Sequence, residues 1–291
     1  MKRIPPKIAV INSFAGYGRC SLTEALPIIS AMGVQACPVP TSVFSNHTGF
    51  PTYYKMDLTR QTADYLAQWN ALGLVFDGIY CGFLGEKEQI PIVASFLKKQ
   101  RQKGNPVVLV DPVMGDHGKT YKTVTPDHCS ALKELVALAD LITPNITEAC
   151  ILTDRPYHDC CWREDELHRL CGELHAMGPK KVAVTGLRQK SAQGCYDDFL
   201  NFISEQRPAD GTIRTMRTVT PMAGPSRHGT GDIFASILAA DAVLGTAFAD
   251  SVKKAADFVG LCIRGSDELD IPEPDGVCFE NYLGMLACRQ S

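Results

Sequence analysis

Val107–Pro112, with the sequence VVLVDP, decides the fold class of this chain. Four consecutive Val and Leu residues suit a central parallel strand that is buried on both faces. Residues with helical spacing flank this run, at Glu86–Lys103 before it and Pro126–Ala139 after it. Such alternation predicts a parallel sheet covered by helices, and Asp111 then lies at the edge where ligands of such folds bind.

The same alternation extends along most of the chain. We predict further strands at Lys7–Ile11, Val34–Val39, Leu74–Cys81, Asp140–Thr143 and Lys181–Thr185. We predict further helices at Ser21–Met32, Thr59–Leu72, Asn145–Leu152, Arg163–Met177, Gly231–Leu244 and Asp250–Arg264. Antiparallel strands are expected at Cys195–Tyr196, Phe199–Ile203 and Thr212–Thr218. No linker rich in Pro, Gly or Ser interrupts the pattern. Residues 1–291 are therefore expected to form a single α/β domain, with a mostly parallel central sheet and an antiparallel edge.

Composition narrows the function classes. Of the 291 residues 45% are hydrophobic and 21% charged, with a net charge of −3, which excludes a disordered chain. The near-neutral charge argues against a nucleic-acid partner or an anionic membrane surface. No apolar run approaches the roughly 18 residues of a membrane span. The apolar run Ile8–Ile11 is shorter than a secretory signal requires. We therefore predict a cytoplasmic protein.

Twelve cysteines are the one unusual count in the composition. No Cys-x-x-Cys occurs, so neither a zinc ribbon nor a thioredoxin-type pair is indicated. Most of the cysteines lie within apolar or helical patterns, where free Cys acts as a small hydrophobic residue. We expect reduced core thiols and no cysteine at a catalytic or ligand-contacting position.

Gly229-Thr230-Gly231-Asp232, followed by an apolar run, is the strongest local signal. Two glycines allow close approach of the backbone to a ligand, and the start of a helix offers free N–H groups to an anion. A carboxylate would compete with that anion unless Asp232 takes a proton from an attacking hydroxyl. The alternative, that Asp232 only caps the helix, is equally compatible with these four residues.

Polar residues follow three of the predicted strands. Asp111 follows the central strand, Asn145 and Glu148 follow the strand that ends at Thr143, and Thr185-Gly186 ends a third. Asp111 and Glu148 are candidates for a hydrated Mg²⁺, which prefers carboxylate oxygens and retains water. An anion hole, a base and metal-binding carboxylates together fit phosphoryl transfer.

Other phosphate-binding classes are excluded by the motifs that the chain lacks. Neither a Gly-x-x-x-x-Gly-Lys-Ser/Thr loop nor the protein-kinase signatures occur, and Gly16-Tyr17-Gly18 lacks the third glycine of a dinucleotide fingerprint. Val43–Gly49 presents an aromatic ring among hydrogen-bonding groups. Such a loop suits a flat heteroaromatic substrate, although alone it also fits an ordinary surface loop.

Taken in order, these segments resemble the vitamin B6 kinases (pyridoxal kinases) of the ribokinase superfamily over nearly the whole chain. The Gly229–Asp232 motif is that of the superfamily. Residues 111–116 and Thr143-Pro144-Asn145-x-x-Glu148 resemble kinases of vitamin-type heterocycles, and Phe44–Gly49 resembles pyridoxal kinases in particular. The resemblance implies a ribokinase-like three-layer α/β/α sandwich.

The resemblance also implies roles for individual residues. Asp232 would deprotonate the 5′-hydroxymethyl group of pyridoxal, pyridoxine or pyridoxamine, and the amides of Gly229, Thr230 and Gly231 would hold the phosphoryl group. The expected contacts for the vitamer are Ser13, Phe44, His47, Thr48 and Phe83. Those for ATP are Asp116, Tyr121, Asn145, Thr185 and Gly186, and those for Mg²⁺ are Asp111 and Glu148.

The resemblance implies ATP and Mg²⁺ as cofactors and a homodimer, and it leaves open whether a monovalent cation such as K⁺ is required.

Two departures from the family pattern lie near the substrate ring. Asn12-Ser13-Phe14 replaces Gln-Ser-His, and Gly82-Phe83 replaces the frequent Gly-Tyr. They leave open which B6 form is preferred. Two alternatives remain: a hydroxymethylpyrimidine kinase of thiamin synthesis, and a non-catalytic B6-binding protein.

Overall fold

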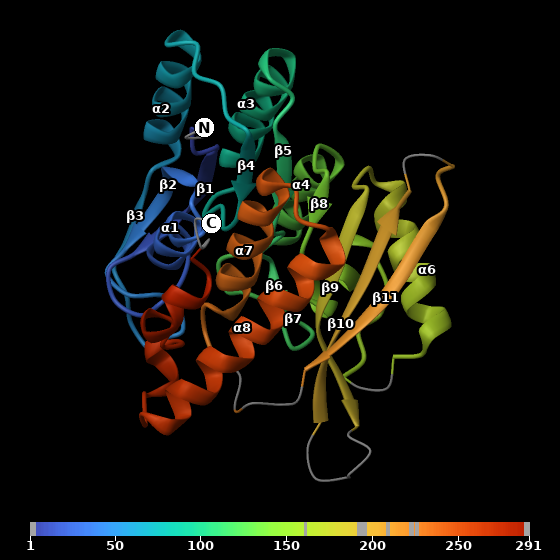
Figure 1. Ribbon diagram of the computed structural model, residues 1–291. Helices are drawn as coiled ribbons and strands as arrows, with labels where there is room; N and C mark the ends of the chain where they lie inside the picture. The colour runs from blue at the N-terminus through green and yellow to red at the C-terminus, as the bar shows by residue number, and fades with distance from the viewer. Residues whose placement is uncertain are drawn as a thin grey trace.

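One mixed sheet of nine strands organises the computed structural model, which describes residues 4–159, 162–190, 197–207, 210–220, 224 and 227–287. The strand order is β11-β10-β9-β8-β5-β4-β1-β2-β3 (Figure 1). These strands are β1 (Lys7–Ala15), β2 (Gln35–Phe44), β3 (Lys55–Asp57), β4 (Gly78–Cys81), β5 (Val107–Val110), β8 (Leu141–Ile142), β9 (Lys181–Lys190), β10 (Asp197–Gln206) and β11 (Ile213–Thr220). A separate two-stranded sheet pairs β6 (Gly115–Asp116) with β7 (Lys119–Thr120).

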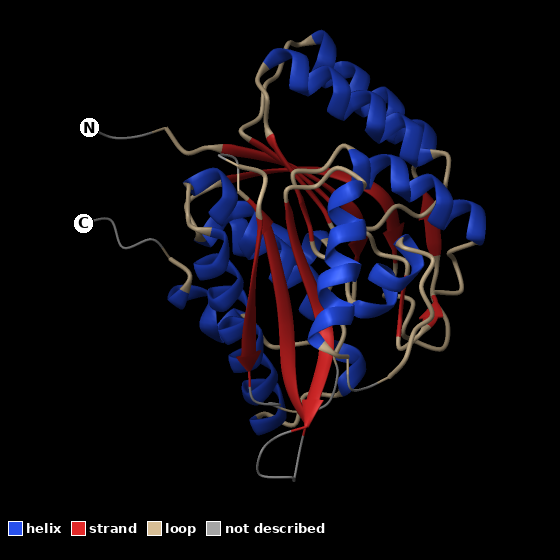
Figure 2. Cartoon of the chain, turned by 90° about the vertical axis from the view of Figure 1, so that its right-hand side faces the viewer, coloured by secondary structure: helices blue, strands red, loops and turns tan. Residues whose placement is uncertain are grey.

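Helices cover both faces of the sheet (Figure 2). They are α1 (Leu22–Ala31), α2 (Thr59–Ala71), α3 (Gln89–Lys103), α4 (Pro126–Ala137), α5 (Ile146–Leu152), α6 (Glu164–Ala176), α7 (Thr230–Leu244) and α8 (Phe248–Glu268), with short 3₁₀ segments η1 (Glu273–Asp275) and η2 (Glu280–Met285). This confirms the predicted three-layer architecture. Among the described helices, none has both the length and the apolar character that crossing a membrane requires.

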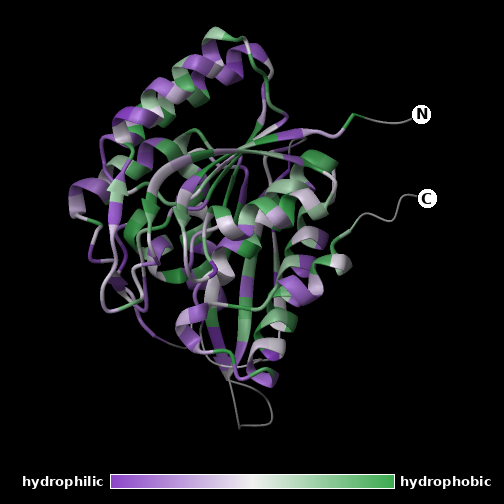
Figure 3. Cartoon of the chain, turned by 90° about the vertical axis from the view of Figure 1, so that its left-hand side faces the viewer, coloured by the Kyte–Doolittle hydropathy of each residue, from purple (hydrophilic) through white to green (hydrophobic). Residues whose placement is uncertain are grey.

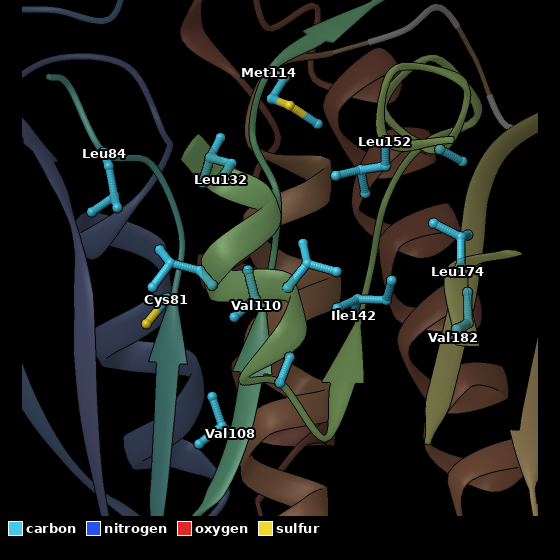
Figure 4. Packing of buried hydrophobic residues seen from close by; sticks show 14 of the residues in the cluster. Cys81, Leu84, Val108, Val110, Met114, Leu132, Ile142, Leu152, Leu174 and Val182 are labelled. Atoms are coloured by element: carbon cyan, nitrogen blue, oxygen red, sulfur yellow. The ribbon is translucent and has the colours of Figure 1, made fainter. Parts of the chain in front are cut away.

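Two hydrophobic clusters fix the layers. One joins one face of the sheet to α2 through α6 and includes Val108, Leu132 and Leu174 (Figure 4). The other joins the opposite face to α1, α7 and α8. Hydrophilic and hydrophobic residues mix along the covering helices (Figure 3), as expected for helices with one face on the core.

The central strand β5 has the predicted bounds, and β4 and β8 flank it in parallel. Antiparallel pairing occurs at both ends of the sheet, through β9–β10–β11 at one end and β2–β3 at the other. The late antiparallel edge was therefore predicted and β3 was missed. At three residues, β3 is too short to show a strand pattern.

Several predicted segments differ in extent from the structure. Strands β1, β2 and β9 continue beyond their predicted ends at Ile11, Val39 and Thr185. Residues 74–77 are not a strand, because Leu74 closes the end of α2 by donating to the Trp69 carbonyl. β10 runs from Asp197 through Gln206, longer than predicted, because its ladder with β11 continues to Gln206. Cys195 and Tyr196 lie outside the described residues.

Candidate active site

A cavity of about 620 Å³ lies at the carboxyl ends of the parallel strands. Ligands of open α/β sheets bind at this edge. The structure brings all the predicted site residues to its walls: Ser13, Phe44, His47, Thr48, Phe83, Asp111, Asp116, Tyr121, Asn145, Glu148, Thr185, Gly186, Gly229, Thr230, Gly231 and Asp232.

The strand order arranges these residues along the cavity. Of the neighbouring strands, β2 ends at Phe44, β1 carries Ser13 near its end, and Phe83 follows β4 by two residues. On the other side, Asp111 and Thr143 directly follow β5 and β8, and β9 carries Thr185. The residues predicted for the vitamer therefore occupy one end, and those predicted for metal and nucleotide occupy the other.

Helix α7 points its N-terminus into this cavity. Its N-cap residue is Gly229, which has a left-handed φ of 87°, and no side chain caps the helix. Glycine adopts this conformation without strain, and a Cβ atom here would overlap the carboxylate of Glu24. An uncapped helix start presents free N–H groups and the positive end of the helix dipole to a ligand.

The Asp232 carboxylate is fixed by three donors at the start of this helix. Its Oδ1 accepts from Asn12 Nδ2 at 3.0 Å and from the Tyr80 hydroxyl at 3.4 Å, and its Oδ2 accepts from the Ser21 backbone N–H at 2.8 Å. Burial raises the pKa of Asp232, and the three donors oppose that shift because they stabilise the charged form. The carboxylate is thus oriented rigidly within the cavity wall.

Asp111 and Glu148 form a second acidic region. Asp111 Oδ1 accepts from Thr143 Oγ1 at 2.9 Å. Glu148 accepts from the backbone N–H of Met114 at 3.0 Å and of Asn145 at 2.9 Å. Burial, with the nearby charge of Asp232, raises the pKa of Asp111 to about 8. Burial and the charge of Asp111 raise the pKa of Glu148. Two buried acids that repel each other favour a cation between them.

The described cavity wall carries far more negative than positive side chains. Asp116 and Glu273 add to the three carboxylates above, and Arg227 is the only Lys or Arg among the described lining residues. The Arg227 guanidinium is already paired with Asp267 at 2.7 Å and donates to the Ile271 carbonyl at 2.9 Å. Anion binding in this cavity therefore depends on backbone amides and added cations.

Aromatic rings form the opposite end of the cavity. Phe44 and Phe83 meet edge to face, with ring centroids 6.0 Å apart, and Tyr53 lies 5.8 Å from Phe44. This arrangement is a corner, so a flat ligand would stack on one ring and meet the edge of the other.

His47 connects the loop after β2 to the rest of the site. Its Nε2 contacts the Pro274 carbonyl at 2.6 Å, and its Nδ1 accepts from the Gly49 N–H at 3.1 Å. This pattern fixes the proton on Nε2. The ring also lies 4.3 Å from that of His228, which borders the cavity beside Gly229. Both ring nitrogens of His47 therefore already have partners within the protein.

Sequence reasoning missed several residues of the site. Asn12 and Ser21 hold Asp232. The sequence placed Asn12 near the substrate ring and Ser21 at the start of a predicted helix, but it gave neither residue this role. Tyr80 gave no signal, since it lies within a buried strand. The apolar Ala256, Val259 and Ile263 of α8 also line the cavity.

One cysteine, Cys20, lines the cavity, and no sequence pattern indicated this. Burial and the charge of Asp232 raise the pKa of its thiol, which makes it a weak nucleophile. The described cysteines are all free, and six of these eight are buried. Cys160, Cys161, Cys195 and Cys288 lie outside the described residues.

Known proteins share this architecture. A family model described as phosphomethylpyrimidine kinase matches residues 26–276. Pyridoxal kinase of Sus scrofa is 32% identical over 244 residues, covering 80% of this chain and 74% of the pig protein. A Bacteroides thetaiotaomicron protein, provisionally assigned as a phosphomethylpyrimidine kinase, superposes with a TM-score of 0.90 at 31% identity, covering 100% of this chain and 97% of that one. A second crystal form of that protein contains pyridoxal.

A more distant structure shares the fold. Pyridoxal kinase of Leishmania donovani, in complex with ADP and pyridoxamine, superposes with a TM-score of 0.86 at 22% identity over 97% of this chain and 95% of that one. Fold and site together define a small-molecule phosphotransferase with a ribokinase-like fold. The chain belongs to the phosphomethylpyrimidine kinase family, and the pyridoxal kinases are among its relatives.

Asn145 provides a test of how the acidic region is built. It is the N-cap of α5 and forms a capping box with Glu148. We expect Asn145→Ala to lower the free energy of unfolding by about 0.5–2 kcal/mol, measured by urea denaturation. It should also raise the KM for the phosphoryl donor, because the cavity loses the Asn145 side chain, whose Nδ2 donates to the Gly115 carbonyl at 2.7 Å.

Thr125→Ala is the matched control. It removes the cap of α4, where Thr125 accepts from the His128 N–H at 3.2 Å, and Thr125 is not among the residues lining the cavity. It should cost similar stability with an unchanged KM. Equal KM values in the two variants would contradict a role for the Asn145–Glu148 box in the site.

Proposed function

We propose that the enzyme transfers the γ-phosphoryl group of ATP to the 5′-hydroxymethyl group of pyridoxal, pyridoxine and pyridoxamine. The observation that carries this proposal is the placement of Asp232 on the start of an uncapped helix, in one cavity with an aromatic corner. The 31%-identical structure that contains pyridoxal supports the choice of acceptor.

In this mechanism the vitamer ring rests against Phe44 and Phe83, with Ser13, His47 and Thr48 nearby. The oxygen of the 5′-hydroxyl attacks the γ-phosphorus while Asp232 accepts the hydroxyl proton. The bond between the γ-phosphorus and the β–γ bridging oxygen breaks, and ADP is released. The amides of Gly229, Thr230 and Gly231 hold the transferring group. A positioned base typically contributes about 10²–10⁴-fold to the rate.

The other end of the cavity would hold the nucleotide. Asp116, Tyr121, Asn145, Thr185 and Gly186 lie along the proposed phosphate path. The apolar part of α8 offers a surface for the adenine ring. The family relationship and the ADP complex of the more distant pyridoxal kinase support ATP as donor.

A divalent cation fits the residues at Asp111 and Glu148. Both donors are carboxylates, the ligand type that Mg²⁺ prefers, and the wall around them lacks a free guanidinium or ammonium group among its described residues. Two carboxylates leave positions for water and phosphate oxygens. When bound, Mg²⁺ would neutralise charge on the phosphates.

Homodimerisation and a cytoplasmic location stay predictions.

An acceptor comparison tests the proposed function. We expect kcat/KM for at least one B6 vitamer to exceed that for hydroxymethylpyrimidine by about tenfold or more, because ring substituents meet fixed polar groups. The assay follows ADP release, with ATP hydrolysis without acceptor as the control. Faster turnover of the pyrimidine would establish the alternative that the family model also fits. Vitamer binding without ADP release would indicate a binding protein.

The pH dependence tests the role of Asp232. The base must be ionised, so activity is lost as pH falls through its pKa, and removing a donor raises that pKa. Asn12→Ala should move the acidic limb of kcat/KM upward by about one pH unit, since a hydrogen bond to a charged group contributes roughly 1.5–3 kcal/mol. Tyr80→Phe, at 3.4 Å, should produce a smaller shift in the same direction.

Tyr65→Phe is the matched control for the tyrosine variant. Tyr65 is an exposed residue of α2 whose hydroxyl donates to the Pro38 carbonyl at 3.1 Å, and it is not among the cavity-lining residues. The acidic limb of kcat/KM for Tyr65→Phe should coincide with that of the native enzyme. An acidic limb that stays in place in both Asn12→Ala and Tyr80→Phe would argue against Asp232 as the base.

A further inference from the structure

Glu24 is a buried carboxyl group that the proposed mechanism does not use. It lies in the first turn of α1 and has no solvent exposure. Neither of its carboxylate oxygens has a hydrogen-bond partner among the described residues. Such a group is costly to bury as an ion, so its presence requires a physical explanation.

The usual role of a Glu at this position is already taken. Glu24 is the third residue of α1 after the N-cap Ser21, where a Glu side chain typically accepts the N–H of the N-cap residue. Here the Ser21 N–H donates to Asp232 Oδ2 at 2.8 Å instead. Asp232 has therefore displaced Glu24 from the cap, and Glu24 turns elsewhere.

Glu24 instead packs directly behind the anion hole. A Cβ atom on Gly229 would overlap both carboxylate oxygens of Glu24, and the Arg19 carbonyl as well. Helices α1 and α7 pack against each other at this point. Glu24 is not among the residues that line the cavity, so the contact is a packed one.

The charges around Glu24 do not offset the cost of burying its carboxylate as an ion. Arg19 is the nearest cation, but its Nε donates to Glu280 Oε1 at 2.7 Å and its Nη1 to the Asp275 carbonyl at 3.1 Å. Burial, and then the charges of Asp232 and Glu280, raise the pKa of Glu24. The titratable groups that face it from the surrounding elements are Arg19, Cys20, Tyr80, Asp232, Cys262 and Glu280.

We propose that Glu24 is a positioning residue that carries a proton at neutral pH and acts as a neutral acid behind Gly229. In this form it adds no negative charge to the helix start, so the amides of Gly229–Gly231 can hold the transferring phosphoryl group. Its ionisation would place an anion behind those amides and end turnover at alkaline pH. This inference rests on the proposed phosphoryl transfer.

Infrared spectroscopy tests the protonation state without turnover. The difference spectrum between the native enzyme and Glu24→Gln at neutral pH should contain the carbonyl stretch of a buried protonated carboxylic acid, because any bands of Asp111 and Glu148 are common to both proteins and cancel. Glu173→Gln is the matched control, because its half-exposed side chain pairs with Arg155 and is not among the charged groups that act on Glu24. It should keep the band. This measurement needs no acceptor, so it stands even where the proposed function fails.

The pH profile of kcat tests the consequence. One pH unit above the midpoint of the native alkaline limb, native kcat should have fallen about tenfold. Glu24→Gln should retain more than about half of its own maximum there, because the amide cannot ionise. Glu24→Met, which is also neutral, should behave in the same way and provides a second variant if one of them folds poorly.

Two results would overturn the proposal. One is the absence of the Glu24 band from the native enzyme at neutral pH, which would mean that Glu24 is ionised. The other is an alkaline limb of the folded Gln and Met variants that coincides with the native one. The proposal is supported if Glu24→Gln loses the band and if the alkaline limb of the Gln and Met variants lies at higher pH than that of the native enzyme.

Discussion

The Asp232 carboxylate is the constraint on which the site depends. It places a negative charge at the start of α7, where the uncapped helix otherwise attracts anions. Asn12 of β1, Ser21 before α1 and Tyr80 of β4 hold this charge in place. These contacts fix α7 against the ends of two central strands. In the proposed function, this oriented carboxylate shares one cavity with the residues assigned to the acceptor and to the nucleotide, as transfer from ATP to a hydroxyl requires.

In and around this cavity, buried carboxyl groups are neutralised by protons, and anions are bound by backbone amides. Basic side chains contribute little. Asp111, Glu148 and Glu24 have raised pKa values because they are buried near other acids. Arg227, the cationic side chain in the described wall, already pairs with Asp267. An enzyme of this kind would accept ATP only with added cations. The same reasoning explains why a net charge of −3 is compatible with binding a polyphosphate: the positive field is local.

Local sequence patterns predicted the central strand and the polar residues that follow the strands. The run Val107–Val110 became β5 with the predicted bounds, and polar residues after the strands gathered in one cavity because parallel strands end at a common edge. The contacts that orient Asp232 could not be predicted, since they join residues 220, 211 and 152 positions apart. Short strands such as β3 and the approach of Cys20 to the cavity likewise depend on tertiary packing.

The central claim is that Asp232 acts in the chemical step and not in binding. Single-turnover rapid-quench kinetics of Asp232→Asn, with saturating ATP, Mg²⁺ and pyridoxal, measure that step directly. We predict that phosphoryl transfer slows by at least about a hundredfold. The dissociation constants for ATP and pyridoxal should stay within about twofold of the native values, as expected for an interaction made in the transition state. Transfer at the native rate, or a loss explained by weaker binding, would contradict the account.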